Sequence, residues 1–393
     1  MNSALLHKEV QNFIDDNLNS DITKLLLKGT KFKNVSTKAV VTQIEAKKRC
    51  QKKLPTWFNT ANIYYPDKLN IEQTSSEATA EYKSKITSGQ SIIDLTGGFG
   101  VDSYHFSKRF KQVTHCEINT ELSAIAKYNF EVLNRQNVTC IPKNGLDYLQ
   151  EENRKFDYMY IDPSRRHDKK GKVFFLSDCL PNVPEHLDTL FKYTDSLLIK
   201  TSPLLDLSIG IKELRTVAEI HIVAVNNEVK ELLWVLKKEV KTGILIKTIN
   251  ITSGVPQLFN FEFKDEKKAQ AEFAEPQLFL YEPNVSILKA GAFKAIGLKY
   301  NLEKLHPHTH LYTSNTLINF PGRRFKIDKV LPFNKKRLKY EKMSMVNIAT
   351  RNFPESVAVL KKRFHFKDGG KIYLFFTTNI KDERIVVVCS KAE

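Results

Sequence analysis

A glycine-rich turn between a short apolar segment and a helix start is the part of this chain best suited to hold a ligand. Residues 91–102 read SIIDLTGGFGVD, and Glu117 follows Asp94 by 23 positions, directly after the next apolar segment at 113–116. Glycine lets the backbone approach a ligand closely, and the first N–H groups of a helix beginning near Val101 are unpaired. A following acidic residue can accept both hydroxyls of a ribose. The pattern predicts a nucleoside-cofactor pocket at the carboxyl end of a parallel sheet.

The acidic residue ahead of the glycines separates two classes of cofactor. A dinucleotide site is expected to read G-x-G-x-x-G, and a carboxylate at Asp94 would repel a diphosphate but suits an ammonium or sulfonium group. The string resembles motif I of class I S-adenosylmethionine-dependent methyltransferases, in which Glu117 takes the place of the ribose-binding acid. Thr96 stands where many members have their first glycine. A tight turn that binds no ligand is the alternative interpretation.

The resemblance implies a set of cofactor-binding residues. Asn144 follows a predicted third strand at 138–142, where the family places a residue on the adenine amino group. Residues 73–75 precede a helix with a capping pattern at Ser76. In this family such a helix covers the cofactor, although a plain helix cap explains each residue equally well. The predicted cofactor-binding residues are Gln73, Thr74, Ser75, Asp94, Thr96, Gly97, Gly98, Gly100, Asp102, Glu117, Ile118, Asn144 and Gly145.

The segment DPSRR follows a predicted fourth strand at 156–162 and resembles motif IV, the [Asp/Asn/Ser]-Pro-Pro-aromatic loop of amino-group methyltransferases. Transfer to an exocyclic amine needs acceptors that orient its N–H bonds, and a carboxylate with a proline carbonyl could supply them. The second proline is replaced by serine, and the aromatic residue by an arginine that could stack on a base. A carboxylate that only caps a turn is the alternative. The predicted catalytic residues are Asp162, Pro163, Ser164, Arg165 and Arg166.

The net charge of +17 is unevenly distributed along the chain. Residues 321–393 contain 18 Lys and Arg against seven Asp and Glu, which gives +11, whereas residues 1–90 carry +5. A basic excess in an end domain indicates a phosphate-binding surface, and a solvated lysine-rich surface is the alternative. The predicted RNA contacts are Arg323, Arg324 and Arg351.

Composition excludes several classes of protein. No apolar run approaches the ~20 residues of a membrane-spanning helix, and no signal peptide is evident, so we expect a cytoplasmic protein without a membrane partner. Five cysteines lie singly, which predicts reduced thiols. His306, His308 and His310 alternate as metal ligands could, but Pro307 interrupts them and a packing role is favoured. We expect no metal, and motifs of P-loop NTPases, α/β-hydrolases and zinc proteases do not occur.

The order of predicted elements is that of an α/β protein with a helical N-terminal region and small α+β domains at its end. Beyond the fourth strand, we expect strands at 197–200 and 219–225, a helix over 228–236, and an antiparallel pair at 243–249 and 258–263. A charged linker is predicted at 264–275. The last part is predicted to contain a helix at 285–295, strands at 311–313 and 316–320, a strand at 325–333, a helix at 334–340, a strand at 345–350, a helix at 354–364 and a hairpin at 372–378 and 385–389.

Three segments near the end of the chain, 281–293, 320–327 and 351–378, resemble a bacterial family of predicted methyltransferases. In that family a class I domain is followed by ferredoxin-like and THUMP-like domains, and with the earlier motifs the resemblance covers nearly the whole chain. THUMP domains are RNA-binding modules of tRNA-modifying enzymes, so the resemblance implies RNA. The predicted domains are 1–88 (helical), 89–265 (a Rossmann-like methyltransferase sheet that binds S-adenosylmethionine), 276–320 (ferredoxin-like) and 321–393 (basic, THUMP-like).

The sequence therefore predicts an S-adenosylmethionine-dependent methyltransferase that acts on tRNA or rRNA at a base nitrogen. An RNA-binding protein that retains the fold without turnover is one alternative, because motif IV is incomplete. A small-molecule methyltransferase with an incidental basic tail is another. The sequence leaves the oligomeric state open.

Overall fold

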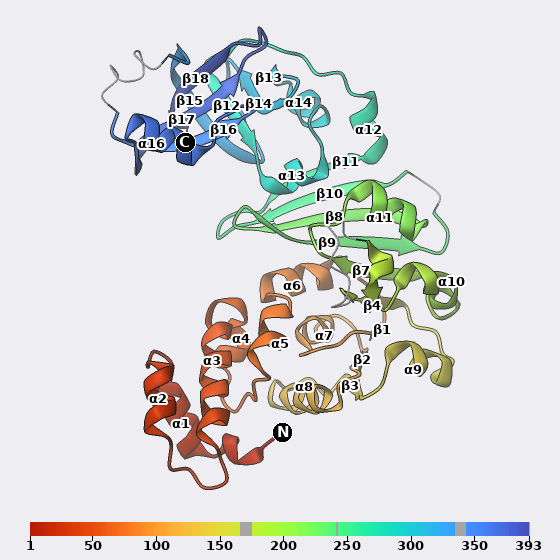
Figure 1. The fold of residues 1–393 in the computed structure, drawn as a ribbon. Coiled ribbons are helices and arrows are strands. Elements are labelled where there is room, and N and C mark those ends of the chain that lie inside the picture. The colour runs from red at the N-terminus through yellow and green to blue at the C-terminus, as the bar shows by residue number, and fades with distance from the viewer. Residues whose placement is uncertain (166–174, 241–242, 335–342, 393) are drawn as a thin grey trace. The chain divides into compact units, whose positions relative to one another are not determined.

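The computed structural model describes residues 1–165, 175–240, 243–334 and 343–392, and Figure 1 draws the others as a thin grey trace. The chain forms two compact units. The first contains Met1–Ala218 and Leu233–Lys241, and the second contains Glu219–Leu232 and Thr242–Glu393.

The first unit begins with a group of helices (Figure 1), as predicted. Side-chain oxygens of Asp21, Ser36, Asp67 and Ser76 cap four of them by accepting backbone N–H groups. A core that includes Trp57 joins these helices to the sheet domain, where Trp57 packs edge-on to Tyr104 at 4.8 Å between ring centroids. The elements are η1 (Ser3–Leu6), α1 (Lys8–Asp16), α2 (Ile22–Lys28), α3 (Thr37–Lys53), α4 (Pro55–Asn59), α5 (Lys68–Gln73) and α6 (Glu77–Lys85).

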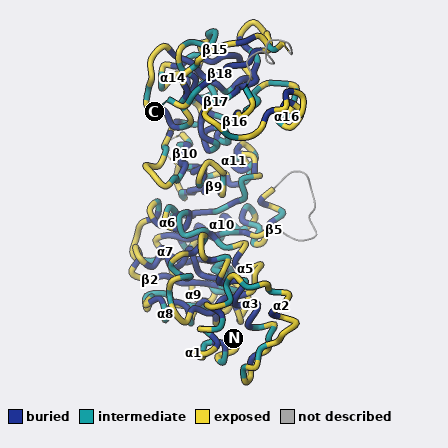
Figure 2. Tube along the Cα trace, turned by 90° about the vertical axis from the view of Figure 1, so that its left-hand side faces the viewer, coloured by how far each residue is buried: buried dark blue, intermediate teal, exposed yellow. Residues whose placement is uncertain are grey.

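A parallel sheet forms the centre of the first unit, in the strand order β7-β4-β1-β2-β3. Its central strands β1, β4 and β7 are largely buried, as their continuous apolar runs predict. Figure 2 colours the chain trace by burial, with buried residues in dark blue. The strands are β1 (Ser91–Asp94), β2 (Gln112–Cys116), β3 (Val138–Ile141), β4 (Tyr158–Ile161) and β7 (Ser196–Thr201), and the helices are α7 (Val101–Phe106), α8 (Thr120–Val132), α9 (Gly145–Glu152), α10 (Val183–Tyr193) and α11 (Leu207–Leu214).

The chain order reverses between β1 and β4, because β2 and β3 follow on one side of β1 while β4 and β7 follow on the other. Ligands of such sheets bind outside the carboxyl ends of the strands at the point of reversal. The Rossmann-like prediction is therefore confirmed. A short hairpin of β5 (Ser164–Arg165) and β6 (Cys179–Leu180), with η2 (Leu176–Asp178), follows β4.

The predicted helix at 228–236 is wrong, because this segment forms strand β9 (Glu228–Lys237) beside β7. Its residues Leu232–Leu236 are all buried, whereas an amphipathic helix would expose one face. The Trp234 indole N–H donates to the Thr201 hydroxyl of β7 at 2.9 Å. A short apolar run does not distinguish a buried strand from a buried helix, and only its neighbour in the sheet decides.

The second unit contains β10 (Leu245–Ile251), β11 (Gln257–Glu262) and all of β8 (Val217–Val225) except its first two residues. Strand β10 is parallel to β8 and antiparallel to β11, which confirms the predicted antiparallel pair. Helix α12 (Phe263–Lys268) lies at the start of the predicted linker. A reciprocal capping box of Glu262 and Asp265 stabilises its N-terminus.

A seven-stranded sheet occupies the end of the chain, in the order β13-β14-β12-β15-β18-β17-β16. Strand β12 of the predicted 276–320 segment pairs with β15 of the predicted 321–393 segment, so the two segments share one sheet. The strands are β12 (Phe279–Pro283), β13 (Glu303–His306), β14 (Thr309–Ser314), β15 (Gly322–Pro332), β16 (Met345–Arg351), β17 (Lys367–Thr378) and β18 (Arg384–Lys391), and the helices are α13 (Val285–Ala290), α14 (Ala295–Tyr300) and α16 (Val357–Phe364).

Two predictions for this last part of the chain differ from the structure. The single helix expected at 285–295 is divided, because Gly291 adopts a left-handed conformation (φ +70°) and ends α13. Residues 316–320 form no strand. The helix expected at 334–340 lies, except for its first residue, outside the described residues, whereas the predicted hairpin at 372–378 and 385–389 is confirmed.

Candidate functional site

A cleft of about 870 Å³ lies at the carboxyl ends of the central strands of the first unit. Segments that are distant in the sequence line it, namely the ends of β1, β2, β4 and β7, the residues that follow α5, and the start of α10. It brings together most of the predicted site residues, which are Gln73, Thr74, Ser75, Thr96, Gly97, Gly98, Asp102, Glu117, Ile118, Asn144, Gly145, Asp162 and Ser164.

Some predicted residues lie elsewhere. Asp94, Gly100 and Pro163 are not among the residues that line this cleft. Arg165 belongs to the small strand β5, where its backbone pairs with Cys179. Arg166 lies outside the described residues.

Glu117 is held against the glycine turn. Its carboxylate accepts the backbone N–H of Gly98 at 2.8 Å through Oε2 and that of Asn119 at 2.8 Å through Oε1. These two bonds fix the carboxylate at the tip of β2, where its remaining lone pairs can accept hydroxyl groups. The next residue, Ile118, is 70% exposed and offers an apolar surface inside the cleft.

Packing accounts for two of the three glycines in the turn. A Cβ on Gly97 would lie 2.3 Å from the His115 ring, and one on Gly100 would lie 2.5 Å from the Phe130 ring. Both rings are buried, so neither can move aside easily. A Cβ on Gly98, at φ +55°, would make only an ordinary contact of 3.9 Å with the Thr96 carbonyl, and Gly98 donates its N–H to Glu117. Space therefore does not require a glycine at this position, but the positive φ favours one.

Asp94 points into the protein instead of the cleft, contrary to the prediction that it faces the cofactor. It is 1% exposed, and it accepts the Thr96 N–H at 3.0 Å and the Ser103 hydroxyl at 2.8 Å. Burial raises the pKa of Asp94 to about 7; the Ser103 hydrogen bond opposes this rise and the charge of Asp102 adds to it. The Thr96 hydroxyl in turn accepts the backbone N–H of Asp162 at 2.7 Å.

Asp102 carries the carboxylate that faces this part of the cleft. Its Oδ2 accepts the Ser75 hydroxyl at 2.8 Å and the Tyr160 hydroxyl at 3.0 Å, while its Oδ1 lies 3.1 Å from the fully buried ammonium of Lys83. Burial would raise the pKa of Asp102, but the charges of Lys83 and Lys200 hold it below its ordinary value. The carboxylate therefore stays ionised.

Lys83 and Tyr160 were missed by the sequence analysis. The sequence held a weak signal for the lysine, because Lys83 follows Thr79 and Ala80 at the spacing of one helix face. In the structure all three residues are buried. A lysine on the buried face of a helix requires an anionic partner, but the sequence does not identify Asp102 as that partner.

Lys200, near the end of β7, is the most important residue that the sequence analysis missed. Its ammonium contacts Oδ2 of Asp162, and both side chains line the cleft. The exposed fractions of the two side chains are 16% and 30%. The signal available in the sequence was a lysine near the end of an apolar strand.

The start of α10 and the residues ahead of it provide a further part of the cleft lining, with Leu180, Asn182, Glu185 and His186. The Asn182 amide donates to Glu185 at 3.1 Å. Its Oδ1 atom is buried and has no hydrogen-bond partner within the described part of the chain. Leu180, by contrast, is 54% exposed.

Asn144 acts as a helix cap, because its side chain accepts the Leu146 N–H at 2.8 Å. It also lines the cleft, so the capping role does not exclude the predicted role at the adenine.

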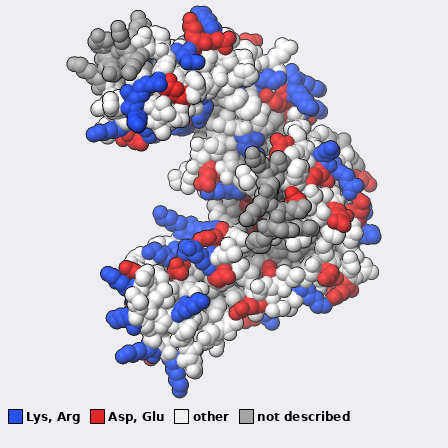
Figure 3. Space-filling model, in the orientation of Figure 1, with Lys and Arg blue, Asp and Glu red and all other residues white. Residues whose placement is uncertain are grey.

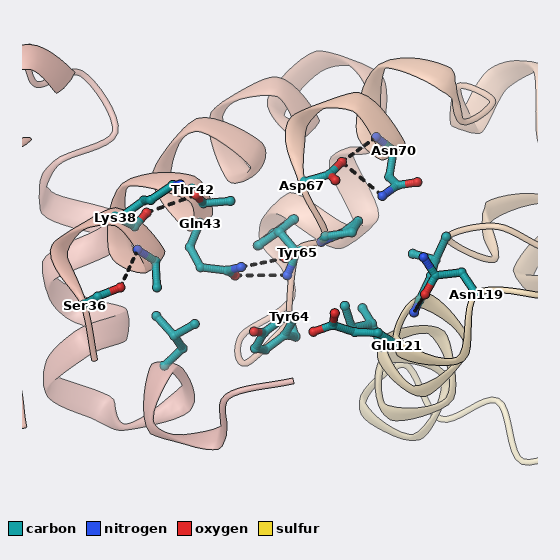
Figure 4. A pocket seen from close by; sticks show the side chains of 15 residues that line it. Ser36, Lys38, Thr42, Gln43, Tyr64, Tyr65, Asp67, Asn70, Asn119 and Glu121 are labelled. Atoms are coloured by element: carbon teal, nitrogen blue, oxygen red, sulfur yellow. Dashed lines mark hydrogen bonds between the residues drawn. The ribbon is translucent and has the colours of Figure 1, made fainter. Parts of the chain in front are cut away.

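A second cavity, of about 380 Å³, lies between the N-terminal helices and α8 and shares Asn70, Asn119 and Leu122 with the cleft (Figure 4). Several of its polar groups hold the structure together. Gln43 exchanges two hydrogen bonds with the Tyr65 backbone, and Asp67 caps α5. Lysines lie on the surface of α2, α3 and the loop between them (Figure 3), and Lys24, Lys28, Lys31, Lys33 and Lys38 are exposed.

In the second unit, two of the three predicted RNA contacts share one partner. Arg323 and Arg351 both bind the carboxylate of Glu282, which is 3% exposed, and Arg351 does so at 2.5 Å. The guanidinium of Arg324 donates to the Ile318 carbonyl at 3.3 Å. The side chains of Arg323 and Arg351 remain 44% and 35% exposed.

The residues that the structure describes contain no cluster of His, Cys, Asp and Glu side chains that could hold a metal ion. His306 instead bonds Asp382 at 2.9 Å, and His310 stacks on Phe293. All five cysteines are free thiols. No helix in the described ranges is long and apolar enough to cross a membrane.

Nearly the whole chain is similar to a known crystal structure. A crystal structure of a putative methyltransferase from Porphyromonas gingivalis W83 is 32% identical and has a TM-score of 0.87, over 98% of this chain and 99% of that one. The chain belongs to the same protein family as this putative methyltransferase. Two family models also match, a ferredoxin-like domain at 279–321 and a THUMP domain-like model at 322–391. The resemblance inferred from the sequence is thereby confirmed.

An uncharacterized RNA methyltransferase of Mycoplasma mobile is 29% identical over 130 residues. The matched region is 32% of this chain and 35% of that protein, so the chain covers about a third of that relative's length.

Proposed function

We propose that the protein is an S-adenosylmethionine-dependent methyltransferase that modifies a base nitrogen of tRNA or rRNA. The observation that carries the proposal is the cleft itself, in which a ribose-type acceptor, Glu117, and a strand-end carboxylate, Asp162, line one cavity at the reversal of the sheet. Family membership supports methyl transfer. The THUMP-like model and the name of the Mycoplasma relative support RNA as the substrate.

The cleft fits the proposed cofactor in three respects. Glu117 presents a fixed carboxylate for the ribose hydroxyls, and the exposed Ile118 offers a surface for the adenine, near Asn144 and Gly145. The ionised Asp102 suits the ammonium of the methionine part, and Gln73, Thr74 and Ser75 suit its carboxylate. When bound, S-adenosylmethionine supplies an activated methyl group on a sulfonium, and the protein's contribution is to position the acceptor.

We assign the acceptor side of the cleft to Asp162 and its neighbours. The carboxylate would accept a hydrogen bond from the base nitrogen, and the Thr96 hydroxyl would fix the loop that carries it. Pro163 would make the loop rigid, while Ser164, Arg165 and Arg166 would contact the base or its phosphate. Arg323, Arg324 and Arg351 would bind RNA phosphates from the second unit.

The alternative is an RNA-binding protein that keeps the cofactor cleft without turnover. The residues that favour it are Ser164 and Arg165, which replace a proline and an aromatic residue of motif IV. Calorimetry with S-adenosylmethionine, followed by transfer of a tritiated methyl group to total RNA from cells that lack the protein, separates the two. Binding with transfer supports the enzyme, and binding of cofactor and RNA without any transfer supports the alternative.

A further inference from the structure

A cation and a carboxylate meet at the acceptor side of the cleft. The Lys200 ammonium contacts Oδ2 of Asp162, and both groups remain partly open to the cleft. The two side chains come from neighbouring parallel strands, since Asp162 follows β4 and Lys200 lies in β7. The pair thus presents one strong donor and one strong acceptor side by side to any base that enters.

This pair is poorly suited to an exocyclic amine. Methylation of an amine develops positive charge on its nitrogen, and a fixed ammonium nearby would oppose that charge. A ring nitrogen that carries a proton beside a carbonyl has the opposite requirement. As its proton leaves, negative charge spreads onto the carbonyl oxygen, which a neighbouring ammonium stabilises.

We propose that the acceptor is N1 of guanine, with Asp162 receiving the N1 proton and Lys200 donating to O6. This inference rests on the proposed function and specifies its substrate. In the step, the N1–H bond breaks and its proton passes to Asp162. The N1–C bond forms as the methyl group leaves the sulfonium, which becomes a neutral thioether. Lys200 exchanges its carboxylate partner for the negative charge that develops on O6 as the proton leaves. In the product O6 is a neutral carbonyl again, and release of the proton from Asp162 to solvent restores the Lys200–Asp162 ion pair.

A second observation selects guanine among bases with such a nitrogen. Guanine carries an amino group next to N1, whereas uracil has no donor in that place. Asn182 lines the cleft, and its Oδ1 is a buried acceptor that is unpaired within the described ranges. Such an atom requires a donor. The guanine amino group supplies that donor. The exposed Leu180 provides an apolar surface for the face of the base.

The product of the reaction tests the assignment. Total RNA from cells that lack the protein is incubated with the enzyme and S-adenosylmethionine, digested to nucleosides and analysed by mass spectrometry. We expect 1-methylguanosine. A methyl group on an exocyclic amine (N2-methylguanosine, N6-methyladenosine or N4-methylcytidine) or 3-methyluridine would overturn the inference while leaving the proposed function intact. No methylation of any nucleoside would overturn both.

The role of Lys200 has its own test. Lys200→Met should reduce single-turnover transfer about 10²-fold, and Lys200→Arg should restore part of it. The ratio of the wild-type rate to the Lys200→Met rate should fall as pH rises, because the N1 proton of guanine then leaves without help from the lysine. The exposed Lys212→Met on α11 is the control. Calorimetry with the demethylated cofactor verifies that each variant folds. A defect of the same size at every pH would contradict the inference.

Asn182 gives a readout independent of transfer. Once the target nucleotide is mapped, two RNAs are compared that carry guanosine or inosine at that position, since inosine lacks the amino group. The affinity of the enzyme for each RNA is measured in the presence of the demethylated cofactor. Wild-type protein should prefer guanosine, and Asn182→Leu should remove the preference. An equal preference in both proteins would overturn the assignment of Asn182.

Discussion

The Thr96 hydroxyl accepts the backbone N–H of Asp162 at 2.7 Å and so connects the glycine turn after β1 to the loop after β4. Thr96 also donates its own N–H to Asp94 at 3.0 Å. The residue that departs from the usual glycine thus joins the predicted cofactor side of the cleft to its acceptor side.

Thr96→Val should test this connection, because valine keeps the volume and removes the acceptor. We expect the free energy of unfolding to fall by about 1 kcal/mol, because the partly buried N–H of Asp162 loses its acceptor. Methyl transfer should fall with it. Urea denaturation measures the first effect. Thr23→Val, at an exposed position of α2, is the matched control, and equal stability of the two variants would contradict the connection.

Glu117→Ala should weaken binding of S-adenosylmethionine by about 1.5–3 kcal/mol, the value of hydrogen bonds to a charged acceptor. It also releases the Gly98 N–H, which shapes the turn. Isothermal titration calorimetry with the cofactor and its demethylated product measures the effect. Glu131→Ala removes an exposed carboxylate elsewhere and should bind as the wild type does. Wild-type affinity in Glu117→Ala would count against the ribose assignment.

Asp94 should make stability depend on pH. Its folded-state pKa, raised to about 7 mainly by burial, exceeds its unfolded value, so the folded protein holds this proton more tightly. The contribution of Asp94 to stability is complete below the unfolded pKa of about 4 and is lost as pH rises to about 7. The stability of Asp94→Asn relative to wild type should therefore rise across this range and then level off. Urea unfolding at several pH values measures it, and a constant difference would refute the assignment.

Arg323 and Arg351 should be tested by substitution and not by truncation, because deletion of residues 321–393 removes the partner strand of β12. Replacing both arginines alone would leave Glu282 buried and unpaired. The variant Arg323→Ala/Arg351→Ala/Glu282→Gln avoids this. We expect weaker RNA binding and unchanged cofactor affinity, and the slope of the salt dependence should fall by about one unit for each phosphate that the variant no longer binds. Glu282→Gln alone is the control, and unchanged RNA binding in the triple variant would exclude an RNA-binding role for these arginines.

The parts of the site that depend on local spacing could be predicted from the sequence. The glycine turn, Glu117 and Asp162 each follow a strand that the apolar pattern identifies, and parallel strands bring their carboxyl ends together. Lys200 and Lys83 could not be assigned, because their partners Asp162 and Asp102 are 38 and 19 positions away and only the packing of strands and helices joins them. The pairing of Arg323 and Arg351 on Glu282 depends on the seven-stranded sheet in the same way.

Single-turnover methyl transfer by Asp162→Ala tests the central claim most directly. The assay uses tritiated S-adenosylmethionine and total RNA from cells that lack the protein. We expect wild-type protein to transfer methyl groups and Asp162→Ala to be about 10²-fold slower or more, with cofactor and RNA affinities nearly unchanged, because the interaction matters mainly in the transition state. Equal rates in the two proteins, or binding of cofactor and RNA by the wild type without any transfer, would contradict the account.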